Sequence, residues 1–330
     1  MAVYTTIDNP ELYFQTELYG GTGSGHSPTW NGDTDMQPDI VWIKSRAATS
    51  NQFLYDSVRG ATKEIYVNID NIESAQSTGL TSFNSDGFTL GDSGDLNNSG
   101  GSFVAWGWKE SATAGLDIVS YTGARDSAPT NVSHGNGTVP HCMIFKNYSG
   151  TGQAWSMYHQ AVGNTKQMFL SATNAASGAS TDYFNNTSPT ASVFTLNTEG
   201  SSNYQDWNYI SYIFSPVQGY SKFGSYEGNG NADGTFVYTG FRPAFIITKS
   251  MDSGSSWDIF DNKREGYNVD NDALVADDIT VEATADQIDI LSNGFKCRIA
   301  TDPNVAETYI YMAFAEAPFV NSNGVPCNAR

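Results

Sequence analysis

The feature that most constrains this chain is a pattern that recurs at an interval of a little over 100 residues. A proline is followed by an apolar segment that ends in lysine, in "PDIVWIK" from Pro38, "PHCMIFK" from Pro140 and "PAFIITK" from Pro243. The lysines that end these segments are Lys44, Lys146 and Lys249. A fixed period is the signature of repeated architecture, so the chain is predicted to contain three copies of one structural unit.

Further segments recur in the same order around this anchor. Each copy begins with a strand-like segment that ends in a glycine turn, in "TELYGG", "IVSYTG" and "FGSYEG". After the lysine come "QFLYDS", "WSMYHQ" and "WDIFDN", then "DGFTLG", "ASVFTLN" and "NGFKCR", and last "FVAWGWKE", "YISYIFSP" and "YIYMAFAEAP". The predicted units are residues 1–113 with a short N-terminal segment, 114–217, and 218–330 with a short C-terminal tail.

The closing segment of each unit predicts a buried β-strand. In "FVAWGWKE", Val104, Trp106 and Trp108 alternate with Phe103, Ala105 and Gly107, and both faces are apolar. Such a strand lies in a sheet that is covered on both sides. The lysine at the end of "DIVWIK" is expected where the strand returns to solvent.

Composition also favours β-structure. The chain contains 32 Gly, 18 Tyr and 18 Phe, and only 15% of its residues are charged. Because no segment has a sustained 3.6-residue apolar period, helices should be short or absent. An all-β protein is predicted, with three tandem antiparallel β-sandwich repeats of about 100 residues, each of jelly-roll or concanavalin-like type.

Charge and cysteine content exclude several classes of protein. The net charge of −19 would repel nucleic acid, and no apolar run approaches the ~18 residues that a membrane-spanning helix needs. The first residues lack the basic and apolar regions of an export signal. Three distant cysteines indicate neither a disulfide framework nor a zinc site, and Cys142 and Cys297 are expected to be buried within strands.

The segment "GDSGD" resembles the loop that carries the nucleophilic serine of trypsin-like proteases. Ser93 would need a histidine base and an oxyanion hole, and the histidine that precedes it, His26, lies in a glycine-rich loop. The equivalent loops of the other units, "LNTEGSSNYQDW" and "IATDPNVAET", look unrelated. Ser93 is therefore expected to be a turn residue, and no catalytic residue is assigned.

Metal and hydrolase sites find no better support. The loop "GNGNADG" resembles the start of an EF-hand loop, but Gly240 occupies the position where a bidentate glutamate should close the site. Asx and glycine turns explain this loop, so a surface calcium ion is not supported and no cofactor is predicted. Asp56 and Asp261 occupy equivalent places, with His159 between them in the second unit, which suggests strand-end chemistry rather than a pair of catalytic carboxylates. The chain is not expected to be an enzyme.

Exposed aromatic rings are the remaining candidates for ligand binding, because such rings stack on saccharides in sugar-binding sandwiches. Trp30, in "SPTWNGDTD", and Trp207 lie in polar loops and are the two candidate ligand-binding residues. The tryptophans expected to pack in the core are Trp42, Trp106, Trp155 and Trp257.

The quoted segments together resemble a known group of proteins. The series "PDIVWIKSR", "LYDSVRG", "FNSDGFTLG" and "FVAWGWK", followed by "YSKFGSYEGNGNADGTFVYTGFRPAFIITK" and an ending with "AEAPF", is similar to virion proteins of marine tailed bacteriophages. The resemblance covers essentially the whole chain. It implies concanavalin-like units, a virion location after synthesis in the host cytoplasm, and contacts with other virion proteins.

Two placements on the particle follow from this resemblance. A tail fibre or tail adhesin would present loops to a host-surface glycan or receptor, as a homo-oligomer. A capsid decoration protein would instead place its three units as a pseudo-threefold body over a local threefold axis. No heptad stalk is visible, and residues 1–12 are the sole candidate anchor. A glycan-degrading tail enzyme is a third hypothesis without a supporting motif.

Overall fold

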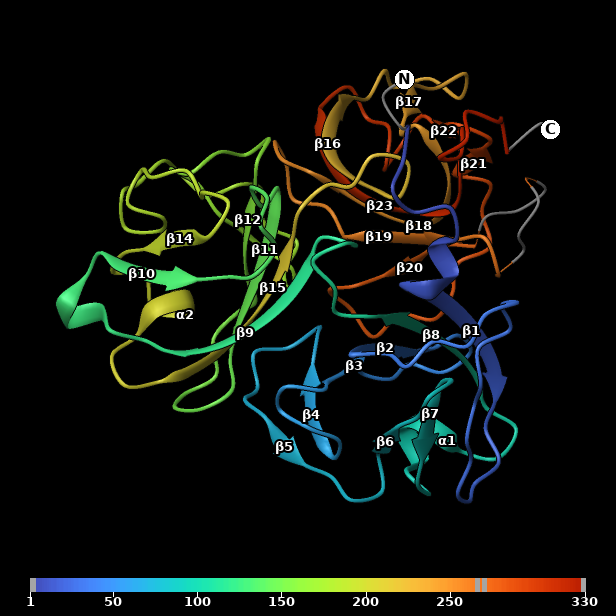
Figure 1. Cartoon of the computed structure of the whole chain (residues 1–330), viewed down its shortest axis with the longest axis horizontal. Coiled ribbons are helices and arrows are strands. Elements are labelled where there is room, and N and C mark those ends of the chain that lie inside the picture. Colours follow the sequence, from blue (N-terminus) through green and yellow to red (C-terminus); the bar gives the residue numbers. More distant parts are fainter. Residues whose placement is uncertain (1–3, 265–267, 269–271, 328–330) are drawn as a thin grey trace.

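The computed structural model describes residues 4–264, 268 and 272–327 and confirms the predicted all-β, antiparallel fold (Figure 1). The helices in the described part of the chain are single turns: η1 (Pro10–Leu12), α1 (Gly94–Asn97), η2 (Arg125–Ser127) and α2 (Gly200–Asn203). Figure 1 shows three lobes, which we call unit 1 (β1 to β8 and their loops), unit 2 (β9 to β15) and unit 3 (β16 to β23).

The strands of the three units have the following bounds. Unit 1 contains β1 (Phe14–Gly20), β2 (Ile40–Ser45), β3 (Phe53–Asp56), β4 (Lys63–Tyr66), β5 (Ser74–Ala75), β6 (Leu80–Phe83), β7 (Phe88–Leu90) and β8 (Ser102–Trp108). Unit 2 contains β9 (Leu116–Thr122), β10 (Thr130–Ser133), β11 (Cys142–Asn147), β12 (Ser156–His159), β13 (Met168–Phe169), β14 (Val193–Leu196) and β15 (Asn208–Phe214). Unit 3 contains β16 (Ser221–Glu227), β17 (Phe236–Tyr238), β18 (Phe241–Ser250), β19 (Asp258–Asp261), β20 (Leu274–Val275), β21 (Ile288–Leu291), β22 (Gly294–Cys297) and β23 (Thr308–Pro318).

The three large sheets have the same strand order. They run β1-β8-β2-β3-β4-β5 in unit 1, β9-β15-β11-β12-β13 in unit 2 and β16-β23-β18-β19-β20 in unit 3. The strand that ends in lysine therefore always lies beside the closing strand. The register is also shared, because Trp42 pairs with Trp106, Ile144 with Tyr212, and Ile247 with Met312.

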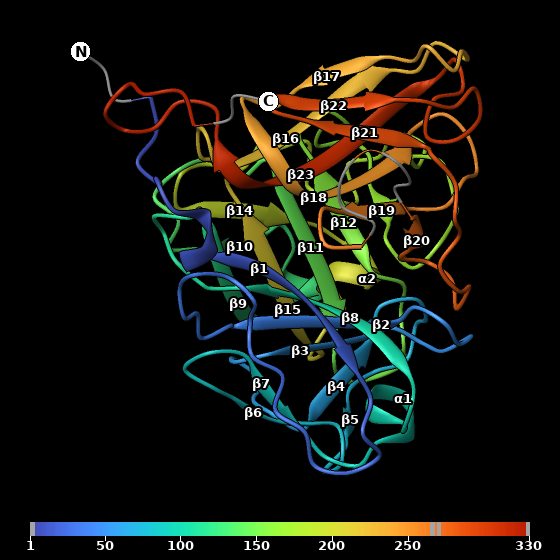
Figure 2. The same ribbon diagram turned by 90° about the vertical axis from the view of Figure 1, so that its right-hand side faces the viewer.

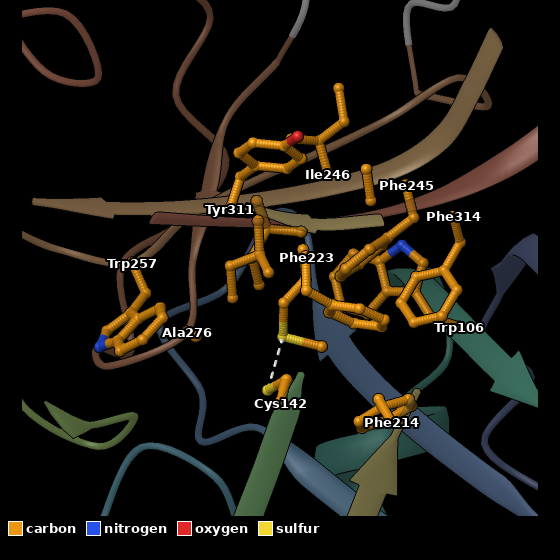
Figure 3. Close-up of a cluster of buried hydrophobic side chains, with 14 of the residues drawn as sticks. Trp106, Cys142, Phe214, Phe223, Phe245, Ile246, Trp257, Ala276, Tyr311 and Phe314 are labelled. Atoms are coloured by element: carbon orange, nitrogen blue, oxygen red, sulfur yellow. Dashed lines mark hydrogen bonds between the residues drawn. The ribbon is translucent and has the colours of Figure 1, made fainter. Parts of the chain in front are cut away.

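A smaller sheet covers the outer face of each large sheet. These sheets are β6-β7, β10-β14 and β17-β22-β21. In unit 1, for example, Phe88 of β7 packs in one cluster with Val41 of β2 and Phe103 of β8. The inner faces of the large sheets form one further cluster to which all three units contribute, so the units do not have fully separate cores. Figure 3 shows part of this shared core, with Trp106 close to Phe245 at a centroid distance of 5.6 Å.

The predicted alternation in the closing strand is confirmed. Val104, Trp106 and Trp108 of β8 lie in the shared core, whereas Phe103 and Ala105 lie in the outer core of unit 1. Both faces of the strand are thus buried. Cys142 and Cys297 are also buried within strands, as expected.

One tyrosine secures the end of each sandwich. The residues Tyr19, Tyr121 and Tyr226 donate hydrogen bonds to the carbonyl oxygens of Leu96, Ser202 and Pro303, at 2.9, 2.6 and 2.7 Å. Each tyrosine ring also stacks on the first aromatic residue of the closing strand, at centroid distances of 5.1 to 5.3 Å. The repeated tyrosine therefore ties the first strand to the loop that precedes the last.

A glycine two residues after each tyrosine allows this loop to approach. A Cβ atom at Gly21, Gly123 or Gly228 would lie only 1.9 to 2.1 Å from a carbonyl oxygen of the loop. The same loop holds a buried asparagine in each unit, and these are Asn97, Asn203 and Asn304. Their side-chain amides donate to backbone carbonyl oxygens, for example from Asn203 to Asn197 at 2.7 Å. The three loops that looked unrelated in sequence thus share one structural residue.

The prediction that the lysine at the end of "DIVWIK" returns to solvent is wrong, and the equivalent lysines of the other units are buried as well. Lys44, Lys146 and Lys249 are at most 1% exposed. Their ammonium groups donate to backbone carbonyl oxygens, which compensates part of the cost of burying the charge. Burial lowers the pKa of Lys44 and of Lys146 to about 8.

Candidate functional site

The three units meet through equivalent hydrogen bonds. The residue directly before β3, β12 or β19 donates a side-chain hydrogen bond to β20, β4 or β13 of another unit, respectively, at a backbone carbonyl oxygen that is equivalent in all three units. The contacts are Trp155 Nε1 to Tyr66 (2.8 Å), Trp257 Nε1 to Phe169 (2.9 Å) and Gln52 Nε2 to Val275 (2.6 Å). Unit 2 thus contacts unit 1, unit 3 contacts unit 2, and unit 1 contacts unit 3, which closes a ring.

A second set of contacts runs around the same ring. The Tyr212 hydroxyl of unit 2 donates to Asp56 of unit 1 (2.7 Å), and Trp106 Nε1 of unit 1 donates to Asp261 of unit 3 (3.0 Å). At the third junction, His159 Nε2 lies 3.3 Å from the carbonyl oxygen of Tyr311 in unit 3. Asp56, His159 and Asp261 end β3, β12 and β19, as predicted, and the same position is a junction between units.

Two of these junctions contain a buried cluster of charges. Asp56 pairs with Arg59 at 2.6 Å, and Arg59 also contacts Glu73 at 3.3 Å. The equivalent residues of unit 3 are Asp261, Arg264 and Glu282, with ion-pair distances of 2.6 and 3.0 Å. Both arginines are at most 2% exposed, so the carboxylates are needed to compensate their charge.

Unit 2 replaces this charged cluster with uncharged residues. The equivalent positions are His159, Val162 and Ala176, and the first two are buried. His159 Nδ1 accepts a hydrogen bond from the Ala161 N–H, so Nε2 carries the proton that is directed at Tyr311. Burial lowers the pKa of His159 to about 4, and the ring is neutral at pH 7.

A cavity of about 40 Å³ lies where the inner faces of the three sheets meet. Its lining includes Trp42 and Trp108 of unit 1, Ile144 of unit 2, and Ile247 and Met312 of unit 3. The exposed lining is entirely apolar, so the cavity offers a water molecule no partner, although its volume would accommodate one. It is best explained as a packing gap at the ring centre.

The two tryptophans that were predicted to bind a ligand have different environments in the structure. Trp30 is only 4% exposed, and its indole N–H donates to the Met36 carbonyl oxygen at 2.8 Å. Its assignment as an exposed ligand-binding residue is wrong, because it fills the outer core of unit 1 beside Phe88. The tryptophans Trp42, Trp106, Trp155 and Trp257 are buried, as expected.

Trp207 is half-buried and takes part in a stack at the surface of unit 2. Its ring lies 4.3 Å from that of Tyr204, over which the Arg125 guanidinium lies at 5.5 Å. A Cβ atom at Gly150 would lie 2.3 Å from the Trp207 ring. Much of the Trp207 surface is therefore occupied by its own neighbours, and Trp207 stays a prediction as a ligand-binding residue.

Comparison with known proteins assigns the chain to a family. Residues 9–318 match the family model described as a domain of unknown function, DUF7483. The chain belongs to the DUF7483 family. No curated protein and no solved structure matches it.

Ser93 of this DUF7483 chain lies in a loop that its backbone helps to hold in place. It directly precedes α1, and its N–H donates to the Thr78 carbonyl oxygen at 3.0 Å. His26, in contrast, forms an isolated β-bridge with Leu90 and packs against the ring of Tyr19. The contacts found for Ser93 and His26 are therefore those of a loop and a strand edge.

The acidic and asparagine-rich loop of unit 3 uses its side chains for its own turns. Asn229 Oδ1 accepts from the Asn231 N–H, and Asn231 Oδ1 accepts from the Asp233 N–H, at 3.0 and 2.9 Å. Asp233 also forms an ion pair with Lys296. Among the residues that the structure describes, no group of three or more His, Cys, Asp or Glu side chains is arranged to hold a metal ion. In the same part of the chain, no helix has the length and hydropathy to cross a bilayer.

Proposed function

We propose that this DUF7483 chain is a non-catalytic structural protein of a tailed-bacteriophage virion and that, as a component of the tail, it contributes to recognition of the host surface. The closed ring of three units carries this proposal. Hydrogen bonds link each unit to both others, and the inner faces share one core, so a force applied to one unit is transmitted to the whole body. Resistance to deformation would suit a particle component that contacts a host cell. The resemblance of the repeated segments to virion proteins supports the same role.

A capsid decoration protein is the second candidate, and one observation favours it. Equivalent residues directly before β3, β12 and β19 link the three units, so a single chain has nearly threefold symmetry. Such a body can occupy a threefold axis of a capsid with one chain, where asymmetric proteins would need three.

Antibody labelling of intact particles tests both candidates. Gold-labelled antibody raised against the purified chain is expected at the tail, in numbers that match a homo-oligomer. Even labelling of the head would overturn the tail placement in favour of decoration. Absence of label from purified particles, while the same antibody detects the chain in infected cells, would refute the virion role altogether. Antibody pre-absorbed with the chain is the control.

A further inference from the structure

The short strand β17 carries two aromatic side chains on its outer face. Phe236 and Tyr238 are 46% and 48% exposed, whereas Val237 between them is 5% exposed and packs into the core. Within the described part of the chain, β17 pairs with β22 alone, so its other edge pairs with no strand. Figure 2 shows β17 and β22 at the top of the view, on the outside of the molecule.

The equivalent positions in the other units are polar. Val237 pairs with Phe295 in unit 3, Val132 pairs with Phe194 in unit 2, and the Pro28 carbonyl oxygen accepts from the Phe88 N–H in unit 1. Phe236 and Tyr238 therefore correspond to Asn131 and Ser133 in unit 2, and to Ser27 and Thr29 in unit 1. Since unit 2 builds the same strand edge, and unit 1 the equivalent loop, with short polar residues, the fold does not require aromatic rings there.

Polar groups surround the two exposed rings. The Lys222 ammonium lies 5.4 Å from the centre of the Tyr238 ring and donates to the Tyr238 carbonyl oxygen at 2.6 Å. The hydroxyl of Tyr4 lies 3.4 Å from that of Tyr238. Lys296, which is paired with Asp233, is the cross-strand neighbour of Phe236. The apolar rings thus lie among hydrogen-bond donors and acceptors.

The size of this surface decides which kind of ligand it fits. Because aromatic side chains present about 150 to 250 Å² each, two rings that are nearly half exposed offer roughly 200 Å². A stable protein partner needs about 800 Å² on each side, several times this area. A sugar ring needs much less, and it combines an apolar face of C–H groups with a rim of hydroxyl groups.

We propose that Phe236 and Tyr238 form a stacking surface for the sugar rings of a host-surface saccharide. The C–H faces of the sugar lie on the two aromatic rings, and its hydroxyl groups bond to the Tyr238 hydroxyl and to the Lys222 ammonium. This inference rests on the proposed role in host recognition for its biological setting, but binding by the purified chain tests it without the particle.

The test uses the residues that unit 2 has at these positions. Wild-type chain, the double variant Phe236→Asn with Tyr238→Ser, and the control Val139→Ser are applied to an array of oligosaccharides of glucose, galactose, mannose, N-acetylglucosamine and uronic acids. Val139 is a comparably exposed apolar residue, 45%, in unit 2. Wild type and control are expected to bind at least one class of saccharide, and the double variant to bind it at least tenfold more weakly. Thermal unfolding checks that all three chains are folded.

Two results would overturn this assignment. One is wild-type chain that binds no saccharide on the array, or a double variant that binds as well as wild type. The other is a wild-type dimer, seen by sedimentation, that dissociates in the double variant, because the surface would then serve a second copy of the chain. Neither result bears on the particle location, which antibody labelling decides separately.

Discussion

Equivalent positions of the three units differ in two regions of the molecule, the buried junctions of the ring and the outer strand edges. At the junctions, units 1 and 3 have a buried Asp–Arg–Glu cluster where unit 2 has His159, Val162 and Ala176. On the outer edges, units 1 and 2 have short polar residues where unit 3 has Phe236 and Tyr238.

The two regions constrain their residues in different ways. A buried charge must be compensated, so the three residues of a junction depend on one another and unit 2 differs from its neighbours at all three. At an outer edge the side chain lies in water and has few neighbours, so a residue can change alone with little effect on stability. Differences at the junctions thus concern folding, whereas differences at the edges are available for binding.

Breaking one charged junction should produce the largest loss of stability. Substitution of Arg59 by Met leaves the buried carboxylate of Asp56, which is 0% exposed, without its ion-pair partner, and a loss of about 3 to 5 kcal/mol in the free energy of unfolding is expected. Introducing the whole set of unit 2, Asp56→His with Arg59→Val and Glu73→Ala, should cost less than half as much. Urea unfolding measures both variants. A triple variant that loses more than Arg59→Met would contradict the interdependence of the three residues.

The stability of the uncharged junction, which contains His159, should depend on pH. The pKa of His159 is lowered by burial to about 4 in the folded chain, and its value in the unfolded chain is about 6.5. Between these values the unfolded chain binds the extra proton, so this junction loses stability as pH falls from 7 to 4, by about 3 kcal/mol in total.

A variant isolates this contribution from other groups. Burial raises the pKa of Glu17 and of Glu110 to about 7, and such carboxyl groups stabilise the folded chain increasingly as pH falls. Unfolding of wild type and His159→Asn is therefore compared at pH 7 and pH 4. The free energy of unfolding of wild type minus that of His159→Asn should be about 3 kcal/mol smaller at pH 4 than at pH 7. An unchanged difference between the two chains would show that His159 does not titrate with a lowered pKa.

The hydrogen bond from the repeated tyrosine is the same in all three units. Replacing Tyr19, Tyr121 or Tyr226 by Phe removes one buried hydroxyl donor from a backbone carbonyl oxygen, so each variant should lose about 1 kcal/mol. The expected result is three similar losses in urea unfolding. If one unit lost more than twice as much as another, the three sandwich ends would not be equivalent.

Much of the fold could be predicted from the sequence because it depends on local patterns. The alternation of Val104, Trp106 and Trp108 with smaller or outer-facing residues gives the closing strand directly. The repeated tyrosine was visible for the same reason, since it lies in a strand that recurs with its neighbours.

The closed ring of three units could not be predicted from local sequence patterns. Gln52 donates to the backbone of Val275, and a backbone carbonyl oxygen belongs to every residue type, so the contact cannot be read from side chains. The buried lysines were missed for this reason as well. For Trp30 the local sequence was misleading. It lies in a segment of polar residues, which suggested an exposed ring, but its side chain packs in the core. Phe236 and Tyr238 could have been found by comparing aligned units, where they replace Asn131 and Ser133.

Exchanging the outer edges should have the smallest effect on stability. Phe236→Asn with Tyr238→Ser removes rings that are nearly half exposed, and the reverse exchange in unit 2, Asn131→Phe with Ser133→Tyr, adds rings to an edge that faces solvent. Both double variants should lie within about 0.5 kcal/mol of wild type in urea unfolding, because neither alters a buried contact. A loss above about 2 kcal/mol in the first variant would mean that the rings stabilise unit 3. The residues of the edges would then be constrained by stability, like those of the junctions, and the aromatic pair would be explained by folding rather than by binding.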